Sequence, residues 1–280
     1  MVKFWSAGRR MRVRVKSMNL LSKHETRRRL LRGMPDSDEL SSLVGQWFQS
    51  PQGIAVLRVE QTLVTPIISR LFGYHILQVG CNNEVSLIGD SPVGHKITFV
   101  PVHRPGSTQP VANNEELPLA NGSIDVVVLH HALDFTDDSH RLLREVTRVL
   151  RPGGQMLIIG FNPISYWGLW KFFKRRIDIP WRGRFISRKR ISDWLHLLEL
   201  HIESVDYGVH FLPLNFPRLL RYADKLEKFG ASIKSPFGGA YFILCIKQRI
   251  PLTPILPKWR SLRSRATVIP AAENVRAKIH

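Results

Sequence analysis

Apolar residues in the middle of the chain follow two spacings, one typical of helices and one typical of buried strands. After Ser50 and Pro51, which suit the cap and the first position of a helix, apolar side chains recur every three or four residues. This spacing predicts an amphipathic helix that bends at Pro66 and ends near Gly73. The face expected to pack is formed by Ile54, Leu57, Gln61, Val64, Ile67 and Leu71. Such a helix would cover a sheet edge or cap a pocket.

Beyond this helix, short apolar and β-branched runs predict strands, and amphipathic runs predict helices. Strands are expected at 75–79, 96–101, 124–129, 155–159, 202–207 and 240–246. Helices are expected after Asp137–Asp138, after Ser187 and over Phe216–Phe229. Apolar strands that alternate with helices indicate a mostly parallel sheet covered on both faces. Ligands of such sheets bind beyond the carboxyl ends of the strands, which directs attention to residues after Gly80, Leu129 and Ile159.

Charge is distributed unevenly along the 280 residues. The chain has 41 Lys and Arg against 22 Asp and Glu, a formal net charge of +19. Such an excess favours a polyanionic partner, either RNA or an anionic membrane surface. Residues 1–40 carry a net +7, residues 41–150 a net −3 and residues 151–280 a net +15. The excess therefore lies at the two ends of the chain, and the central third has the charge of an ordinary enzyme.

The charge pattern divides the chain into three regions. They are a basic, flexible N-terminal arm at 1–40, a central domain at 41–248 with an insertion at about 163–190, and a basic, extended tail at 249–280. Met18 and Met34 are candidates for an internal start. Two cysteines, Cys81 and Cys245, are too few for a disulfide framework. Because no apolar run suits a membrane span, we expect a cytoplasmic protein, with peripheral attachment to a membrane left open.

Two segments carry a motif of defined order and spacing. Residues 113–128 read Asn-Asn-Glu-Glu-Leu-Pro-Leu-Ala-Asn-Gly-Ser-Ile-Asp-Val-Val-Val, and residues 142–154 read Leu-Leu-Arg-Glu-Val-Thr-Arg-Val-Leu-Arg-Pro-Gly-Gly. They resemble the class I S-adenosylmethionine-dependent methyltransferases, in the methyltransferase type 11 group that includes quinone-biosynthesis methyltransferases. The resemblance covers about residues 70–165. Further motifs extend it to about residues 42–260 and are similar to an uncharacterised bacterial subfamily.

The resemblance implies an α/β fold with a Rossmann-like, doubly wound, seven-stranded sheet whose last strand is antiparallel. It implies S-adenosylmethionine as the cofactor and a small-molecule methyl acceptor, which we expect to be apolar. The sulfonium of this cofactor supplies the driving force, so the protein mainly aligns the reactants and excludes water. No nucleophilic side chain is needed, and the resemblance assigns no catalytic residue.

By the same resemblance, the first cofactor loop corresponds to residues 78–84. Glycines there let the backbone approach the cofactor. Gly80 is kept, whereas Gln78 replaces an acid, Asn82 replaces a glycine, and Glu84 adds bulk and negative charge where the cofactor carboxylate would lie. The second strand lacks the usual acid for the ribose, and His103 is a weak substitute. These departures leave open whether the loop still binds the cofactor.

Other positions of the motif match landmarks of the cofactor site. Asn113 corresponds to the acid that accepts from the adenine amino group, Leu117 would pack on the adenine, and His130 would border the methionine end. The full set of expected cofactor-binding residues is Gln78, Gly80, Cys81, Asn82, Asn113, Asn114, Leu117 and His130.

Two further features allow more than one interpretation. His130 and His131 could form a metal cluster with Asp134, Asp137, Asp138 and His140, but without a ligand spacing such as His-x-x-x-His we expect no metal. A second hypothesis is that His131 acts as a general base. Residues 166–190 interleave seven aromatic and nine basic residues. We favour a cover over the substrate pocket with its aromatic side chains inward, and a membrane or nucleic-acid surface is the alternative.

These observations support two functions of different classes. The first is a methyltransferase that acts on a small acceptor. The second is a methyltransferase-like fold that has lost catalysis and binds RNA or an anionic membrane through its basic aromatic surface. Binding of S-adenosylmethionine separates the two.

Overall fold

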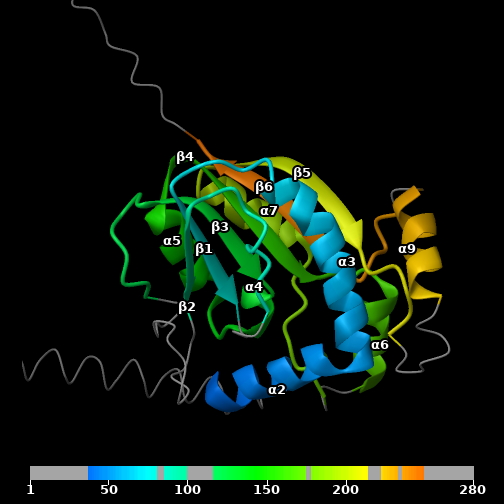
Figure 1. Cartoon of the computed structure of the whole chain (residues 1–280). Coiled ribbons are helices and arrows are strands. Elements are labelled where there is room, and N and C mark those ends of the chain that lie inside the picture. The colour runs from blue at the N-terminus through cyan, green and yellow to red at the C-terminus, as the bar shows by residue number, and fades with distance from the viewer. Residues whose placement is uncertain are drawn as a thin grey trace, which may run out of the picture. The chain divides into compact units, whose positions relative to one another are not determined.

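Six strands form one sheet in the computed structural model, which describes residues 37–80, 85–99, 116–174, 178–213, 222–232 and 235–248 (Figure 1). They are β1 (His75–Gly80), β2 (His95–Phe99), β3 (Ile124–His130), β4 (Leu150–Phe161), β5 (Leu200–Gly208) and β6 (Ala240–Lys247). Their order is β2-β1-β3-β4-β6-β5. The first four run parallel, and β6 is antiparallel to both β4 and β5. The residue pattern predicts six strands and the family resemblance implies seven; the described residues supply six.

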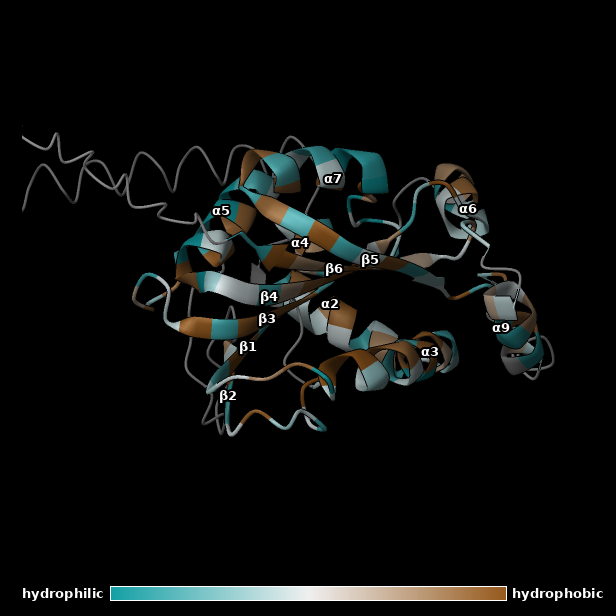
Figure 2. Ribbon diagram, turned by 90° about the horizontal axis from the view of Figure 1, so that it is seen from above, coloured by the Kyte–Doolittle hydropathy of each residue, from teal (hydrophilic) through white to brown (hydrophobic). Residues whose placement is uncertain are grey.

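Helices cover both faces of this sheet. They are α2 (Ser37–Gln49), α3 (Pro51–Ile68), α4 (Ala132–Phe135), α5 (Ser139–Val149), α6 (Tyr166–Lys174), α7 (Arg188–Leu197) and α9 (Ala223–Ser232). Helices α2 and α3 lie on one face, and α5 and α7 lie on the other (Figure 2). Strand β3, between these layers, is buried along its whole length, which confirms the doubly covered α/β sheet. Among the described helices, none combines the length and the apolar character that a membrane crossing requires.

Side-chain caps begin three helices where the sequence predicts them. The Ser50 hydroxyl accepts the Gly53 N–H at 3.1 Å, and Pro51 occupies the first position of α3. Asp138 accepts the N–H groups of the second and third residues of α5. Ser187 caps α7 in the same way. Each cap satisfies N–H groups that have no partner within the helix, so these helices begin as predicted.

The buried face of α3 differs from the predicted face. Its buried residues are Gln52, Gly53, Val56, Val59, Glu60, Val64 and Ile68. Val64 and Leu71 of the predicted face are buried, and Leu57 and Ile67 pack against the core. Ile54 is 46% exposed and Gln61 is also exposed, so the prediction is wrong at these two positions. Val56, Glu60 and Val64 follow at intervals of four and therefore share one side of the helix. The carboxylate in the middle of this series conceals it from a purely hydrophobic pattern.

Strand ends meet at one edge of the sheet, which we call the carboxyl edge. Gly80 at the end of β1 pairs in register with His130 at the end of β3. Farther along, Phe161 at the end of β4 and Gly208 at the end of β5 both pair with Ala240. Residues that follow β1, β3, β4 and β5 therefore emerge along the same edge, where ligands bind in open α/β sheets.

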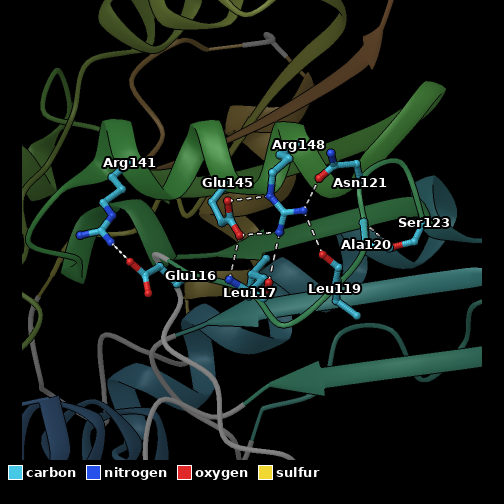
Figure 3. A network of polar contacts seen from close by, with 9 residues as sticks. All are labelled: Glu116, Leu117, Leu119, Ala120, Asn121, Ser123, Arg141, Glu145 and Arg148. Carbon is cyan, nitrogen blue, oxygen red and sulfur yellow. Dashed lines mark hydrogen bonds and ion pairs between the residues drawn. The ribbon is translucent and has the colours of Figure 1, made fainter. Parts of the chain in front are cut away.

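A polar network attaches helix α5 to the segment before β3 (Figure 3). The Glu145 carboxylate accepts the Leu117 N–H at 2.9 Å and an Arg148 N–H at 2.6 Å. Arg148 also donates to the carbonyl oxygens of Leu117 at 3.1 Å and Leu119 at 2.9 Å. Glu145 and Arg148 belong to the motif at 142–154, so this part of the motif fixes a loop to the framework.

Asp125, which belongs to the motif at 113–128, has a similar structural role. Its carboxylate accepts the backbone N–H groups of Tyr74 at 2.6 Å and His75 at 2.8 Å, and it pairs with Arg151. A side chain at Gly154 would meet the Asp125 carbonyl oxygen at 2.8 Å, which is too close for any other residue. The motif residues therefore fix where β1 begins and how closely β4 approaches β3.

Candidate functional site

Two of the residues expected to bind the cofactor meet at the carboxyl edge. Gly80 and His130 are neighbours in register at the ends of β1 and β3, and His130 is only 2% exposed. Of the other expected residues, Gln78 and Leu117 make contacts within the fold, and the rest lie outside the described ranges. Outside them are Cys81, Asn82, Asn113 and Asn114.

Gln78 is fully buried on β1 and uses both polar atoms of its side chain within the fold. Its Nε2 donates to the Val85 carbonyl at 2.6 Å, and its Oε1 accepts the Leu87 N–H at 2.9 Å. The amide therefore holds residues 85–87 against β1. An ionised acid at this position would offer no donor to Val85, so glutamine suits this contact better. Its expected contact with the cofactor stays a prediction.

Leu117 is buried in the same core cluster as Val79 and Leu129, which stand one residue before the ends of β1 and β3. Its backbone is held on both sides, because Glu145 accepts its N–H and Arg148 donates to its carbonyl (Figure 3). The loop is thus fixed to helix α5. The expected contact of Leu117 with an adenine ring stays a prediction.

A buried group of four titratable side chains, the His–Glu cluster, consists of Glu60, His130, His131 and Asp134. The Glu60 carboxylate on α3 accepts from His130 Nε2 at 2.9 Å and from His131 Nε2 at 2.7 Å. His131 Nδ1 donates to Asp134 Oδ2 at 2.9 Å, and the same oxygen accepts the Phe161 N–H at 2.9 Å. One continuous chain of hydrogen bonds therefore joins α3, the end of β3, α4 and the end of β4.

Aromatic rings enclose the two histidines. Phe161 stacks on His131 with a centroid distance of 4.0 Å, and Phe48 of α2 lies 5.3 Å from His130. His131 has φ of 49°, in the left-handed region that residues with side chains rarely adopt. Its N–H donates to the Ile159 carbonyl at 3.0 Å. This unfavourable backbone conformation turns the imidazole toward the carboxylates on both sides of it.

Burial and charge act in opposite directions on the cluster. Burial alone lowers the pKa of His131, but the Glu60 charge and the hydrogen bonds to Asp134 and Glu60 outweigh it and raise the pKa to about 9. Burial raises the pKa of Glu60, yet the charges and hydrogen bonds of the two histidines lower it to about 2. For His130, burial prevails and the pKa is lowered.

The hydrogen-bond partners lead to the same protonation states. Both ring nitrogens of His131 face carboxylate oxygens, which only accept, so both carry a proton and the ring is an imidazolium. His130 directs one N–H at Glu60 and is neutral. Burial raises the pKa of Asp134, against the hydrogen bonds from His131 and Phe161. With both acids ionised, the cluster carries one net negative charge.

Glu60, His130 and His131 also offer three ligand atoms within 4.8 Å of one another. Two imidazoles and a carboxylate are a common zinc-binding set. However, each Glu60 oxygen already accepts one imidazole N–H, and a metal would need those nitrogens without their protons. The contacts seen are those of a hydrogen-bonded cluster.

Glu60 is the residue of this site that the sequence analysis missed. His130, His131 and Asp134 are close in sequence and attract attention together, whereas Glu60 lies 70 residues from His130. The feature of the sequence that could have revealed Glu60 is its position between Val56 and Val64 on the buried side of α3. A lone acid within an apolar series indicates a buried partner.

Comparison with known proteins shows which family this chain belongs to. The chain is 32% identical over 208 residues to the uncharacterized protein YafS of Escherichia coli strain K12, and the alignment covers 74% of this chain and 82% of YafS. A family model described as a methyltransferase domain matches residues 101–158. A possible histamine N-methyltransferase from Thermotoga maritima, described as S-adenosylmethionine-dependent, has the same fold, with a TM-score of 0.52. The chain belongs to the class I S-adenosylmethionine-dependent methyltransferases.

Other similar proteins are more distant in sequence or match over a shorter part of the chain. The Thermotoga maritima protein is 16% identical, and the superposition covers 73% of this chain and 94% of that one. A putative methyltransferase of Haloferax volcanii has a TM-score of 0.52 at 14% identity, over 75% and 98% of the two chains. The ubiquinone/menaquinone biosynthesis methyltransferase UbiE of Hahella chejuensis is 38% identical over 93 residues, which is 32% of each chain. S-adenosylmethionine is the cofactor of this methyltransferase family.

Proposed function

We propose that this methyltransferase acts on a small acceptor that loses a proton during methyl transfer, and that His130 takes this proton. The observation that supports the proposal is the position of the His–Glu cluster. It places a neutral imidazole, backed by a buried carboxylate, beside Gly80 at the carboxyl edge. Family membership provides the methyl donor, and the cluster provides the proton acceptor.

The described residues fit the cofactor at this edge. Gly80 ends β1 without a side chain and lies beside His130, so a ligand can approach the backbone there. Buried Oδ1 of Asp134 has no hydrogen-bond partner within the part of the chain that the structure describes. An unpaired carboxylate oxygen favours a cationic ligand. We assign Gly80, His130 and Asp134 to the end of the site that would receive the methionine part of the cofactor.

The cluster performs the proton step as follows. When bound, the cofactor would supply an electrophilic methyl group on its sulfonium. His130 accepts the acceptor's proton at Nδ1, because its Nε2 keeps the proton directed at Glu60. The Glu60 carboxylate stabilises the resulting imidazolium, as a carboxylate does in other His–acid pairs. The added proton brings the net charge of the cluster from minus one to zero.

Aromatic side chains near this edge support an apolar acceptor. Trp167 at the start of α6 is buried against Phe161 at a centroid distance of 6.1 Å and against Trp181 at 5.7 Å. Phe185 also stacks on Phe161, at a centroid distance of 4.9 Å. Such surfaces bind apolar groups and exclude water from the reaction. We propose that they form one wall of the acceptor site.

Calorimetric titration with S-adenosylmethionine and S-adenosylhomocysteine tests the proposal. We expect saturable binding, and we expect Gly80→Asp to abolish it, since a charged side chain would fill the approach to the backbone. Gly89→Asp is the matched control, because a side chain there meets nothing within 4 Å. Absent binding by the unaltered protein would favour the alternative, a methyltransferase fold that has lost catalysis.

A further inference from the structure

Helix α6 is apolar on both its inner and its outer side. Trp167 is buried and Trp170 packs against the core. On the outer side, Tyr166 and Leu169 are exposed, and Phe172 and Phe173 are 82% and 68% exposed. A helix that is apolar all round is normally covered on every side. The outer face of α6 therefore indicates a surface that is covered when the protein works.

A hydrogen-bonded junction connects α6 to further exposed apolar residues. Asn162, between β4 and α6, donates to the carbonyl oxygens of Ile164 at 3.2 Å, Pro236 at 3.0 Å and Gly238 at 3.0 Å. Ile164 is exposed, and so is Phe237 in the turn that Asn162 binds. The junction thus places these two side chains in neighbouring segments, next to the start of α6.

The same turn is tied to helix α9. His210, after β5, donates its N–H to Glu227 of α9 at 2.7 Å, and its imidazole contacts the Glu227 carboxylate at 3.0 Å and the Ser235 carbonyl at 3.2 Å. Helix α9 exposes Leu226 and Phe229, and Figures 1 and 2 both show α6 and α9 at the same end of the sheet. Together these elements form one apolar region, which we call the α6–α9 surface.

Basic residues accompany this surface. Lys225 and Lys228 are exposed on α9, and the sequence from 171 to 176 reads Lys-Phe-Phe-Lys-Arg-Arg. Between residues 166 and 190 there are nine basic residues and one acid, Asp178. Exposed aromatic and aliphatic side chains next to lysine and arginine are the composition of helices that bind at an anionic lipid surface.

We propose that the α6–α9 surface binds an anionic membrane, with Ile164, Leu169, Phe172, Phe173, Phe229 and Phe237 in the interfacial layer. The aliphatic side chains of this surface favour lipid over RNA as the partner, because they neither stack on bases nor donate hydrogen bonds. Helix α6 follows β4 and α9 follows β5, so this surface adjoins the carboxyl edge. The membrane can therefore deliver an apolar acceptor to the site; this last step rests on the proposed function, whereas the binding does not.

Sedimentation with vesicles tests the surface. The full chain is mixed with phosphatidylcholine vesicles, with vesicles that also contain phosphatidylglycerol, and with single-stranded RNA. We expect binding to the phosphatidylglycerol vesicles, and we expect Phe172→Glu with Phe173→Glu to weaken it about tenfold or more. The matched control is Phe72→Glu with Tyr74→Glu, because these aromatic residues are 73% and 79% exposed at the start of β1, away from the carboxyl edge.

Each outcome decides the proposal. Loss of vesicle binding in the Phe172 and Phe173 variant, with binding kept in the control, supports it. Equal binding by both variants, or binding to RNA without binding to vesicles, overturns it. Circular dichroism of the same samples shows that the variants are folded. Calorimetry with S-adenosylhomocysteine separates failure of the membrane proposal from failure of the proposed methyltransferase activity.

Discussion

Glu60 determines the protonation of the candidate site. Its carboxylate accepts from both His130 and His131, and it is the main reason that the pKa of His131 is raised against the effect of burial. Glu60→Gln removes this charge, so we expect the pKa of His131 to fall by at least one unit from about 9. Proton NMR of the imidazole rings across a pH series measures the change. Glu39→Gln, an exposed acid on α2, should leave the titration unchanged.

The same residues make stability depend on pH in a defined direction. The pKa of His131 rises on folding from 6.5 to about 9, so its contribution is complete below 6.5 and is lost as the pH rises through 9. The pKa of Glu60 falls from 4.5 to about 2, so its contribution is complete above 4.5 and is lost in acid. We expect the free energy of unfolding to decrease by up to about 3 kcal/mol from pH 6 to above pH 9.

Urea denaturation at several pH values measures this decrease. His131→Asn should remove most of the decrease in unfolding free energy at alkaline pH. His196→Asn, at an exposed position of α7, should leave this decrease unchanged. A wild-type stability that is flat between pH 6 and above pH 9 would show that His131 is neutral in the folded protein.

The places of individual residues in the fold could be predicted where their sequence neighbours carried the information. Gly80 and His130 stand at the ends of predicted strands, and a parallel sheet brings such ends together. Glu60 is different, because its partners lie about 70 residues away and only tertiary packing supplies them. Gln78 shows a further limit, since the sequence does not reveal that Val85 and Leu87 engage both its polar atoms.

Secondary-structure elements followed from local signals more reliably than their buried faces did. Ser50, Asp138 and Ser187 begin helices because a cap needs only nearby N–H groups. Helix α2 was missed, although its Val44 and Phe48 are buried, because it follows a basic arm and has few apolar repeats. In α6 the aromatic side chains divide, with Trp167 inward as expected and Phe172 outward against expectation.

The Glu145–Arg148 network gives a test at the scale of elements. Arg148 donates to Glu145 and to two carbonyl oxygens of the loop that contains Leu117. Arg148→Ala removes these bonds and leaves the carbonyl groups to water, so we expect a loss of about 1 to 2 kcal/mol in the free energy of unfolding. Arg144→Ala, an exposed position on the same helix, is the control for helix propensity. Equal losses in the two variants would mean that the network adds nothing.

At the scale of the whole molecule, the basic excess and the enzyme-like centre have separate places. Residues 41–150, which are slightly acidic, supply β1, β3 and the His–Glu cluster. Helices α6 and α9 lie in the basic second half, beyond the ends of β4 and β5. The charge and the aromatic content of the sequence do not reveal which side chains of α6 face outward, because this helix has aromatic residues on both its inner and its outer side.

This separation predicts that the two binding activities can be removed independently. Phe172→Glu with Phe173→Glu changes side chains that point away from the core, so we expect S-adenosylhomocysteine to bind as it does to the wild type while vesicle binding is lost. Gly80→Asp alters the end of β1, so the opposite pattern is expected. Calorimetry and vesicle sedimentation on both variants complete the comparison. If either variant lost both activities while remaining folded, the cofactor site and the membrane surface would have to depend on one another.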